Sequence, residues 1–138
     1  MNKEFFLRQF MDEVWNQKNS GKVEKYIHSK YTIHLDTADP WEGKTLTHLE
    51  FKERLQHSFN AFPDMHFEIT FAIEEEKHVA ITWILTGTNL GVIGGFPPTN
   101  KKIKTNGITI YHFKENLISG HTQVFDRVTV AKQLGFVK

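Results

Sequence analysis

The chain has 138 residues, of which 39% are hydrophobic and 13% aromatic, and this length suits one domain built around one core. Its 17 basic and 16 acidic residues are scattered and leave a formal net charge of +1, so the basic surface that a nucleic acid selects is absent. There is no cysteine, no amino-terminal apolar region and no apolar run near the ~20 residues of a membrane-spanning helix. We therefore expect one domain over residues 1–138, in the cytoplasm, with neither a nucleic acid nor a membrane as partner.

The order of the predicted elements, helices first and strands later, is typical of an α+β fold. Apolar residues recur at helical spacing up to residue 62, and from residue 65 they alternate with polar residues. The predicted helices cover residues 2–17, 22–27, 47–62 and 128–134, and the predicted strands cover 31–35, 65–73, 79–87, 103–113 and 117–125. This order favours helices packed on one face of a strongly bent sheet.

Local patterns indicate where the third helix begins and which face of the next strand is buried. Thr47 and Glu50 have the spacing of a capping box, and Leu46 is placed to pack on Phe51, so the helix begins after Thr47. Pro63 ends it, because proline cannot continue the helical hydrogen-bond ladder. In the strand that follows, we expect the buried face to carry Met65, Phe67, Ile69, Phe71 and Ile73.

The segment from Gly87 to Thr99 reads GTNLGVIGGFPPT. It resembles the G-x-H-x-G-x-x-x-G-x-P-P-T stretch of the SnoaL-like polyketide cyclases, or ester cyclases, of the nuclear-transport-factor-2-like superfamily. A plain glycine and proline turn between two strands is the alternative interpretation. Further matches to the family follow its order over nearly the whole chain: residues 26–28 (YIH), 61–64 (AFPD), Ile118, His121, Asp126 and 133–135 (QLG).

The resemblance implies both a fold and a chemistry. The fold is a cone in which amino-terminal helices pack on a strongly curved, mainly antiparallel sheet that encloses one pocket, with the segment 87–99 over its mouth. Members of the superfamily usually pair through one sheet face, so a homodimer is expected. The chemistry is an intramolecular aldol closure of an apolar polyketide by acid–base residues, without a metal or an organic cofactor. Such a reaction needs a carboxylate whose pKa is raised by burial.

The sequence departs from the family at the positions that carry this chemistry. When the chain is aligned on His121 and Asp126, the acid–base aspartate of the family falls on Gln123, which cannot take a proton. The histidine of the G-x-H motif is Asn89. Pocket positions that are polar in the cyclases are occupied here by Ile33, Gly107 and Thr109.

The last strand carries the strongest candidates for catalysis. Alternation puts His121 and Gln123 on one face, which by the resemblance is the pocket face. His121 is then either a general base or an imidazole whose hydrogen bonds are satisfied inside the core. Asp126 has the opposite parity and is either part of the catalytic group or the N-cap of the last helix. The predicted catalytic residues are therefore His121, Gln123 and Asp126.

Predicted ligand contacts come from aromatic side chains and from the positions that the family implies. His34 lies with Asp36 and Asp39 in a segment that is either the rim of the pocket or a solvated loop. No histidines or carboxylates have the spacing of metal ligands, so we predict neither a metal nor a cofactor. The predicted ligand-binding residues are Trp15, Tyr31, Ile33, His34, Phe59, Trp83, Asn89, Phe96, Gly107 and Thr109, and core packing is the alternative for the aromatic ones.

Three functions are compatible with these patterns. The first is an enzyme that performs an aldol-type cyclisation, or a related lyase or isomerase step, on a hydrophobic compound with a carbonyl group. The second is a non-catalytic protein that binds an apolar small molecule, because Gln123 replaces the acid–base aspartate of the family. The third is a structural role in a dimer, which rests on the fold alone.

Overall fold

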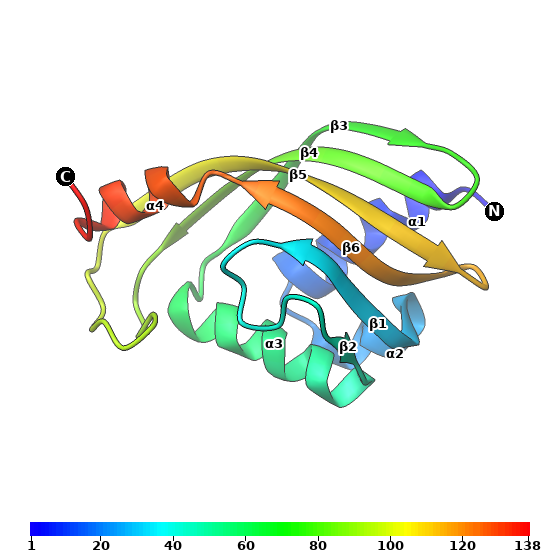
Figure 1. The fold of residues 1–138 in the computed structure, drawn as a ribbon, viewed down its shortest axis with the longest axis horizontal. Coiled ribbons are helices and arrows are strands. Elements are labelled where there is room, and N and C mark those ends of the chain that lie inside the picture. Colours follow the sequence, from blue (N-terminus) through cyan, green and yellow to red (C-terminus); the bar gives the residue numbers. More distant parts are fainter.

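The structure, a computed structural model, describes all residues from Met1 to Lys138. The chain forms four α-helices and six strands, and Figure 1 shows their arrangement. The helical elements are α1 (Lys3–Phe10), a π-helical turn (Met11–Asn16), a 3-10 turn (Ser20–Lys22), α2 (Val23–Tyr26), α3 (His48–Ala61) and α4 (Arg127–Leu134). The strands are β1 (Ile27–Asp36), β2 (Thr45–Leu46), β3 (His66–Glu74), β4 (His78–Thr88), β5 (Lys102–Lys114) and β6 (Leu117–Phe125).

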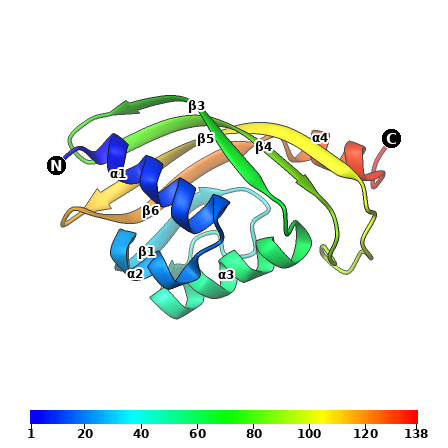
Figure 2. The ribbon, with the colours of Figure 1, turned by 180° about the vertical axis from the view of Figure 1, so that it is seen from behind.

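The six strands form one curved sheet that is not closed, in the order β2-β1-β6-β5-β4-β3. All neighbouring pairs are antiparallel except β1 and β6, which run parallel. The sheet arches over α1 and α3, which both lie on its concave side (Figures 1 and 2). This is the α+β architecture with helices on one face of a strongly curved, mainly antiparallel sheet that the sequence predicts.

Local sequence accounts for the ends of the helices. The Thr47 hydroxyl accepts a hydrogen bond from the Glu50 backbone and the Glu50 carboxylate accepts one from the Thr47 backbone, so the predicted capping box is confirmed. Asp126 caps α4 by accepting a hydrogen bond from the backbone N–H of Thr129. None of the helices is both long and apolar enough to cross a membrane.

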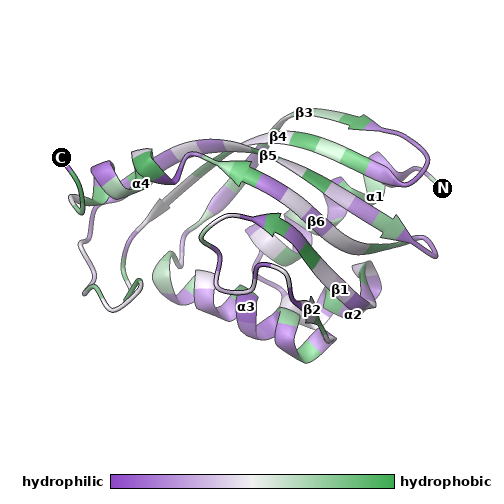
Figure 3. Ribbon diagram, viewed as in Figure 1, coloured by the Kyte–Doolittle hydropathy of each residue, from purple (hydrophilic) through white to green (hydrophobic).

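The core fills the space between the concave face of the sheet and the helices. It is a cluster of 21 buried residues in which aromatic rings meet edge to face, such as Tyr31 and Phe51 with ring centroids 4.8 Å apart. The partly buried Phe67 packs against this cluster in the same way, with its ring centroid 5.1 Å from that of Trp83. Hydrophobic and hydrophilic residues alternate along β4, β5 and β6 in Figure 3, which is the pattern of a sheet with one buried face.

The structure corrects the prediction for the outer half of β3. A bulge lies between Ile69, which pairs with Trp83, and Phe71, which pairs with the adjacent Thr82. The extra residue reverses the alternation, so Phe71 and Ile73 are 60% and 58% exposed, while Ala72 packs against the core. The prediction that Phe71 and Ile73 lie on the buried face is therefore wrong.

β1 also differs from its prediction, because it begins at Ile27 rather than at residue 31. The strand pairs in parallel with β6 from its first residue to its last, since Ile27 pairs with Ile118 and Asp36 with Gln123. This pairing decides the geometry of the site, because it brings the end of β1 beside the end of β6.

Apolar side chains also gather on the convex face of the sheet. Phe71, Thr82, Ile108 and Val124 follow one another across β3, β4, β5 and β6, since each is paired with the next. A second row across the same face contains Ile73, Ile110 and Leu35. The six apolar residues of these rows, which we call the outer patch, are between 37% and 64% exposed: Leu35, Phe71, Ile73, Ile108, Ile110 and Val124.

Candidate active site

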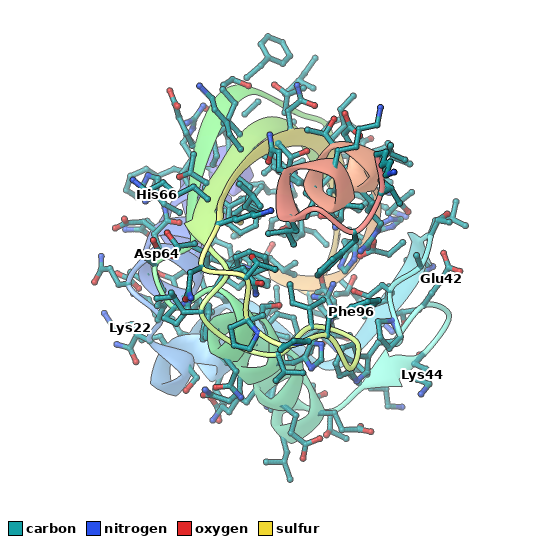
Figure 4. All side chains as sticks on the ribbon, turned by 90° about the vertical axis from the view of Figure 1, so that its left-hand side faces the viewer. Lys22, Glu42, Lys44, Asp64, His66 and Phe96 are labelled. Carbon is teal, nitrogen blue, oxygen red and sulfur yellow. The ribbon has the colours of Figure 1, made fainter.

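One cavity of about 360 Å³ lies between the concave face of the sheet, α3 and α4. It is lined by 26 residues, of which 18 are hydrophobic. The lining includes Ile93 of the loop between β4 and β5 and Phe136 of the carboxy-terminal tail, so the cavity extends to the end of the molecule that faces the viewer in Figure 4. Its polar wall is formed by Tyr31, Asp39, Arg54, His121, Gln123 and Arg127, together with His57 and Ser58.

Asp36 lies behind this polar wall and is hydrogen-bonded to four of its side chains. The carboxylate is 1% exposed and accepts four hydrogen bonds. His121 Nε2 lies 2.9 Å from Oδ2, and Gln123 Nε2 and Arg54 each donate to the same oxygen at 3.2 Å. Arg127 donates to Oδ1 at 2.8 Å. Asp36 therefore ties β1 to β6, to α3 and to the start of α4.

The surroundings of Asp36 keep it ionised. Burial by itself raises the pKa of a carboxyl group, because the charged form loses its hydration. Here the hydrogen bond from His121 and the charges of Arg54 and Arg127 outweigh burial, and the pKa of Asp36 is held below its ordinary value. The site thus contains a buried carboxylate, but one that is stabilised as an anion rather than poised to take a proton.

His121 is placed between Asp36 and Tyr31. Its ring is 3% exposed, and Nδ1 lies 2.6 Å from the Tyr31 hydroxyl oxygen. Burial lowers the pKa of His121, and the hydrogen bond to Asp36 offsets this only in part. The imidazole is therefore neutral at pH 7.

Tyr31 comes from the middle of β1 and is held by packing against Phe51 of α3. Its side chain lines the cavity and is almost completely buried. Burial raises the pKa of the phenol well above its ordinary value, so Tyr31 is protonated across the physiological range.

Gln123 is oriented by a chain of hydrogen bonds behind the cavity wall. Trp83 Nε1 donates to the Thr109 hydroxyl at 2.8 Å, and that hydroxyl donates to Gln123 Oε1 at 2.7 Å. The amide nitrogen of Gln123 consequently points to Asp36. Gly107 makes room for this arrangement, because a Cβ at that position would lie 2.5 Å from both Trp83 and Phe125.

Like Arg127, Arg54 is a functional side chain that the sequence analysis missed. It is 9% exposed, lines the cavity, and donates through one terminal nitrogen to Asp36 and, at 2.8 Å, to Asp39. Its Nε atom is buried without a hydrogen-bond partner. The sequence could have indicated it, because Arg54 lies three residues after Phe51 and is therefore a charged residue on the apolar face of α3.

The predicted site residues separate into two groups. The cavity is lined by five of them: Trp15, Tyr31, Trp83, His121 and Gln123. The others lie outside the lining: Ile33, His34, Phe59, Asn89, Phe96, Gly107, Thr109 and Asp126. Thr109 and Gly107 support the wall from behind, and Asp126 is the surface N-cap of α4.

The structure gives the remaining residues of the second group other surroundings. His34 lies against His112, with ring centroids 4.4 Å apart. Asn89 is fully buried and secures the loop between β4 and β5, because its amide binds Gly91 and Thr99. Phe96 lies on this loop (Figure 4) and stacks on Phe136 at 4.4 Å. The 87–99 segment is thus joined to the carboxy-terminal tail that lines the cavity.

The chain is similar to known proteins over nearly its whole length. The family model described as SnoaL-like polyketide cyclase matches residues 6–134. A suspected polyketide cyclase from Acidithiobacillus ferrooxidans is 40% identical, with a TM-score of 0.91 over 100% of this chain and 97% of that one. IdmH, a suspected polyketide cyclase from Streptomyces antibioticus, is 21% identical, with a TM-score of 0.80 over 98% and 99% of the two chains.

A structure with a different description has the same fold. AclR from Streptomyces galilaeus, a suspected hydroxylase, is 18% identical, with a TM-score of 0.80 over 98% of this chain and 82% of that one. No curated protein matches the chain.

Proposed function

The chain belongs to the SnoaL-like polyketide cyclase family, and we propose that it is an enzyme that transfers a proton at a carbon atom next to a carbonyl group of an apolar small molecule. An aldol-type cyclisation begins with this step, and related lyase and isomerase reactions share it. The observation that carries the proposal is the buried group of Tyr31, His121 and Asp36 at the polar wall of an otherwise apolar cavity.

The cavity supports a small, largely apolar substrate. Its volume lies at the lower end of the range for small-molecule sites, and aromatic rings such as Trp15, Trp83 and Phe67 form its walls. The polar wall offers a neutral imidazole, a phenol and two guanidinium groups, from Arg54 and Arg127. An enolate formed from a ketone would be stabilised by these cations in a site of low dielectric constant.

Exchange of α-protons tests the proposal without knowledge of the natural substrate. We would incubate 1-tetralone, a bicyclic ketone, with the protein in D2O and follow loss of the α-proton signal by NMR. The wild type should exchange these protons faster than buffer and at least about 100-fold faster than His121→Gln, because an amide cannot take a proton. Equal rates for buffer, wild type and variant, across a panel of cyclic ketones and 1,3-diketones, would reject the enzyme.

A binding protein for an apolar small molecule is the second candidate. The observation in its favour is Gln123, an amide without an accessible pKa that takes the position of the family's acid–base aspartate. Native mass spectrometry of protein purified from cells would distinguish the two functions. A bound apolar compound that the protein leaves chemically unchanged supports the binder, and an empty cavity together with α-proton exchange supports the enzyme.

We also propose that the protein pairs with a second copy through the outer patch. Its six apolar side chains are partly exposed on the convex face and none of them carries a charge. Monomeric proteins seldom expose a continuous apolar surface of this kind. Because the patch lies on the face opposite the cavity, two copies paired there would leave both cavities open.

A further inference from the structure

Both ring nitrogens of His121 already have hydrogen-bond partners within the protein, so neither is available to bind a ligand. Asp36 is an ionised acceptor, because the partners Arg54, Arg127 and Gln123 all donate to it. His121 Nε2 therefore carries a hydrogen and donates it to Asp36. In a neutral imidazole the other nitrogen is then the acceptor, so Nδ1 accepts the hydrogen of the Tyr31 hydroxyl, 2.6 Å away.

The Tyr31 hydroxyl is the next polar group along this chain. It gives its only hydrogen to His121, and its oxygen keeps a lone pair for a further hydrogen bond. Both side chains line the cavity, but only the phenol has unused capacity to interact with a ligand there. Resting on the proposed function, we infer that Tyr31 is the catalytic residue that exchanges a proton with the ligand, that His121 receives the proton of Tyr31, and that Asp36 is a positioning residue. We call these three residues the relay.

The step balances without a co-reactant. A C–H bond next to the ligand carbonyl breaks, its electron pair stays with the ligand as an enolate, and the proton bonds to the Tyr31 oxygen. At the same time the original O–H bond of Tyr31 breaks and an N–H bond forms at His121 Nδ1. Return of the proton to carbon or to oxygen of the product reverses these changes and restores the neutral imidazole.

The relay avoids a buried phenolate and places the positive charge that it creates beside an anion. A free phenolate at Tyr31 would be costly, since burial raises the pKa of this group well above its usual value. When both protons move together, no phenolate forms, and the positive charge appears on His121. There it lies 2.9 Å from the Asp36 carboxylate, whose charge stabilises the imidazolium.

The tautomer of His121 is the first test, and it needs no substrate. Nitrogen-15 NMR of the wild type at pH 7 should show a protonated Nε2 and an unprotonated Nδ1 that accepts a hydrogen bond. In Tyr31→Phe the Nδ1 resonance should shift in the direction of a lost hydrogen bond while Nε2 stays protonated. A wild type with hydrogen on Nδ1, or a Tyr31→Phe spectrum in which Nδ1 does not change, would overturn the relay.

The second test separates Tyr31 from a general effect of lost hydroxyl groups. Tyr26 is the matched control: it is also a buried tyrosine of the core, its hydroxyl donates to Glu13 Oε2, and it does not line the cavity. Tyr31→Phe keeps the ring that packs on Phe51, so folding should be preserved. We expect Tyr31→Phe to slow exchange of the α-protons of 1-tetralone by about 100-fold or more, and Tyr26→Phe by less than about threefold.

The outcomes distinguish this inference from the proposed function. Suppose that the wild type exchanges protons, that the rate of Tyr31→Phe is within about threefold of the wild-type rate, and that His121→Gln exchanges none. His121 then contacts the ligand directly, and the relay is wrong. If the wild type exchanges none of the ketones, the proposed function fails, whatever the NMR of His121 shows. Loss of exchange in both Tyr31→Phe and His121→Gln, with Tyr26→Phe active, supports the relay.

Discussion

At the scale of residues, the site depends on one carboxylate that no local pattern identifies. The sequence analysis found His121 and Gln123 from alternation along one strand, and both line the cavity. Asp36 was recognised only as a member of a loop cluster. Its role requires β1, α3, β6 and the start of α4 to meet at one point, and this depends on the parallel register between β1 and β6.

Substitution of Asp36 should destabilise the protein strongly. Asp36→Asn removes the buried charge that both Arg54 and Arg127 bind and leaves Asp39 as the one anion paired with Arg54; removing one partner of a buried ion pair costs about 3–5 kcal/mol. Urea denaturation would measure the loss. Asp126→Asn is the matched control, because asparagine also caps a helix and should change stability by less than about 0.5 kcal/mol. A similar small change for both variants would contradict the account.

At the scale of elements, the sequence predicted which helices and strands form, and in what order, better than it predicted which of their side chains face the core. The helices and the long strands were found, because their apolar periodicity extends over many residues. The bulge in β3 was missed, since Phe71 and Ile73 continue the apolar alternation of the sequence while the backbone reverses it. β2 has only two residues, too few for any period to be recognised.

Gly107 of β5 gives an element-scale prediction. A methyl group there would lie 2.5 Å from the Trp83 ring and from Phe125, so the indole must move and its hydrogen bond to Thr109 must weaken. Gly107→Ala should cost about 1–3 kcal/mol of stability, as overpacking does, and alter the fluorescence of Trp83. Gly87→Ala in β4 is the control, because its Cβ would meet Phe62 at an ordinary 3.4 Å. Equal stability of the two variants would show that the wall tolerates displacement.

At the scale of the whole molecule, the curved sheet separates two apolar surfaces. Its concave face carries the core and the cavity, and its convex face carries the outer patch. The resemblance to the cyclases gave this fold from the sequence, whereas the position of the outer patch could not be predicted, because the bulge in β3 turns two of its members outward.

The proposed pairing can be tested on a residue of the outer patch. Val124→Lys would place a charge within the proposed interface, where its desolvation opposes association. Sedimentation equilibrium at micromolar concentration should give twice the 16.1 kDa chain mass for the wild type and the single-chain mass for the variant. Leu49→Lys, which changes an exposed leucine of α3, should remain a dimer. A monomeric wild type would exclude the pairing.

The central claim, that neutral His121 finally receives the proton while Tyr31 stays un-ionised, is tested most directly by the pH dependence of exchange. The pKa of His121 is lowered from 6.5 by burial, and that of Tyr31 is raised well above 10. We would measure kcat/KM for 1-tetralone exchange from pH 4.5 to 9 and check folding by circular dichroism at each pH. The account predicts a plateau from pH 7 to 9 and a fall with one proton at an apparent pKa below 6.5, because imidazolium cannot accept the proton of Tyr31. A rate that rises tenfold per pH unit between 7 and 9 would instead identify phenolate or hydroxide as the base and contradict it.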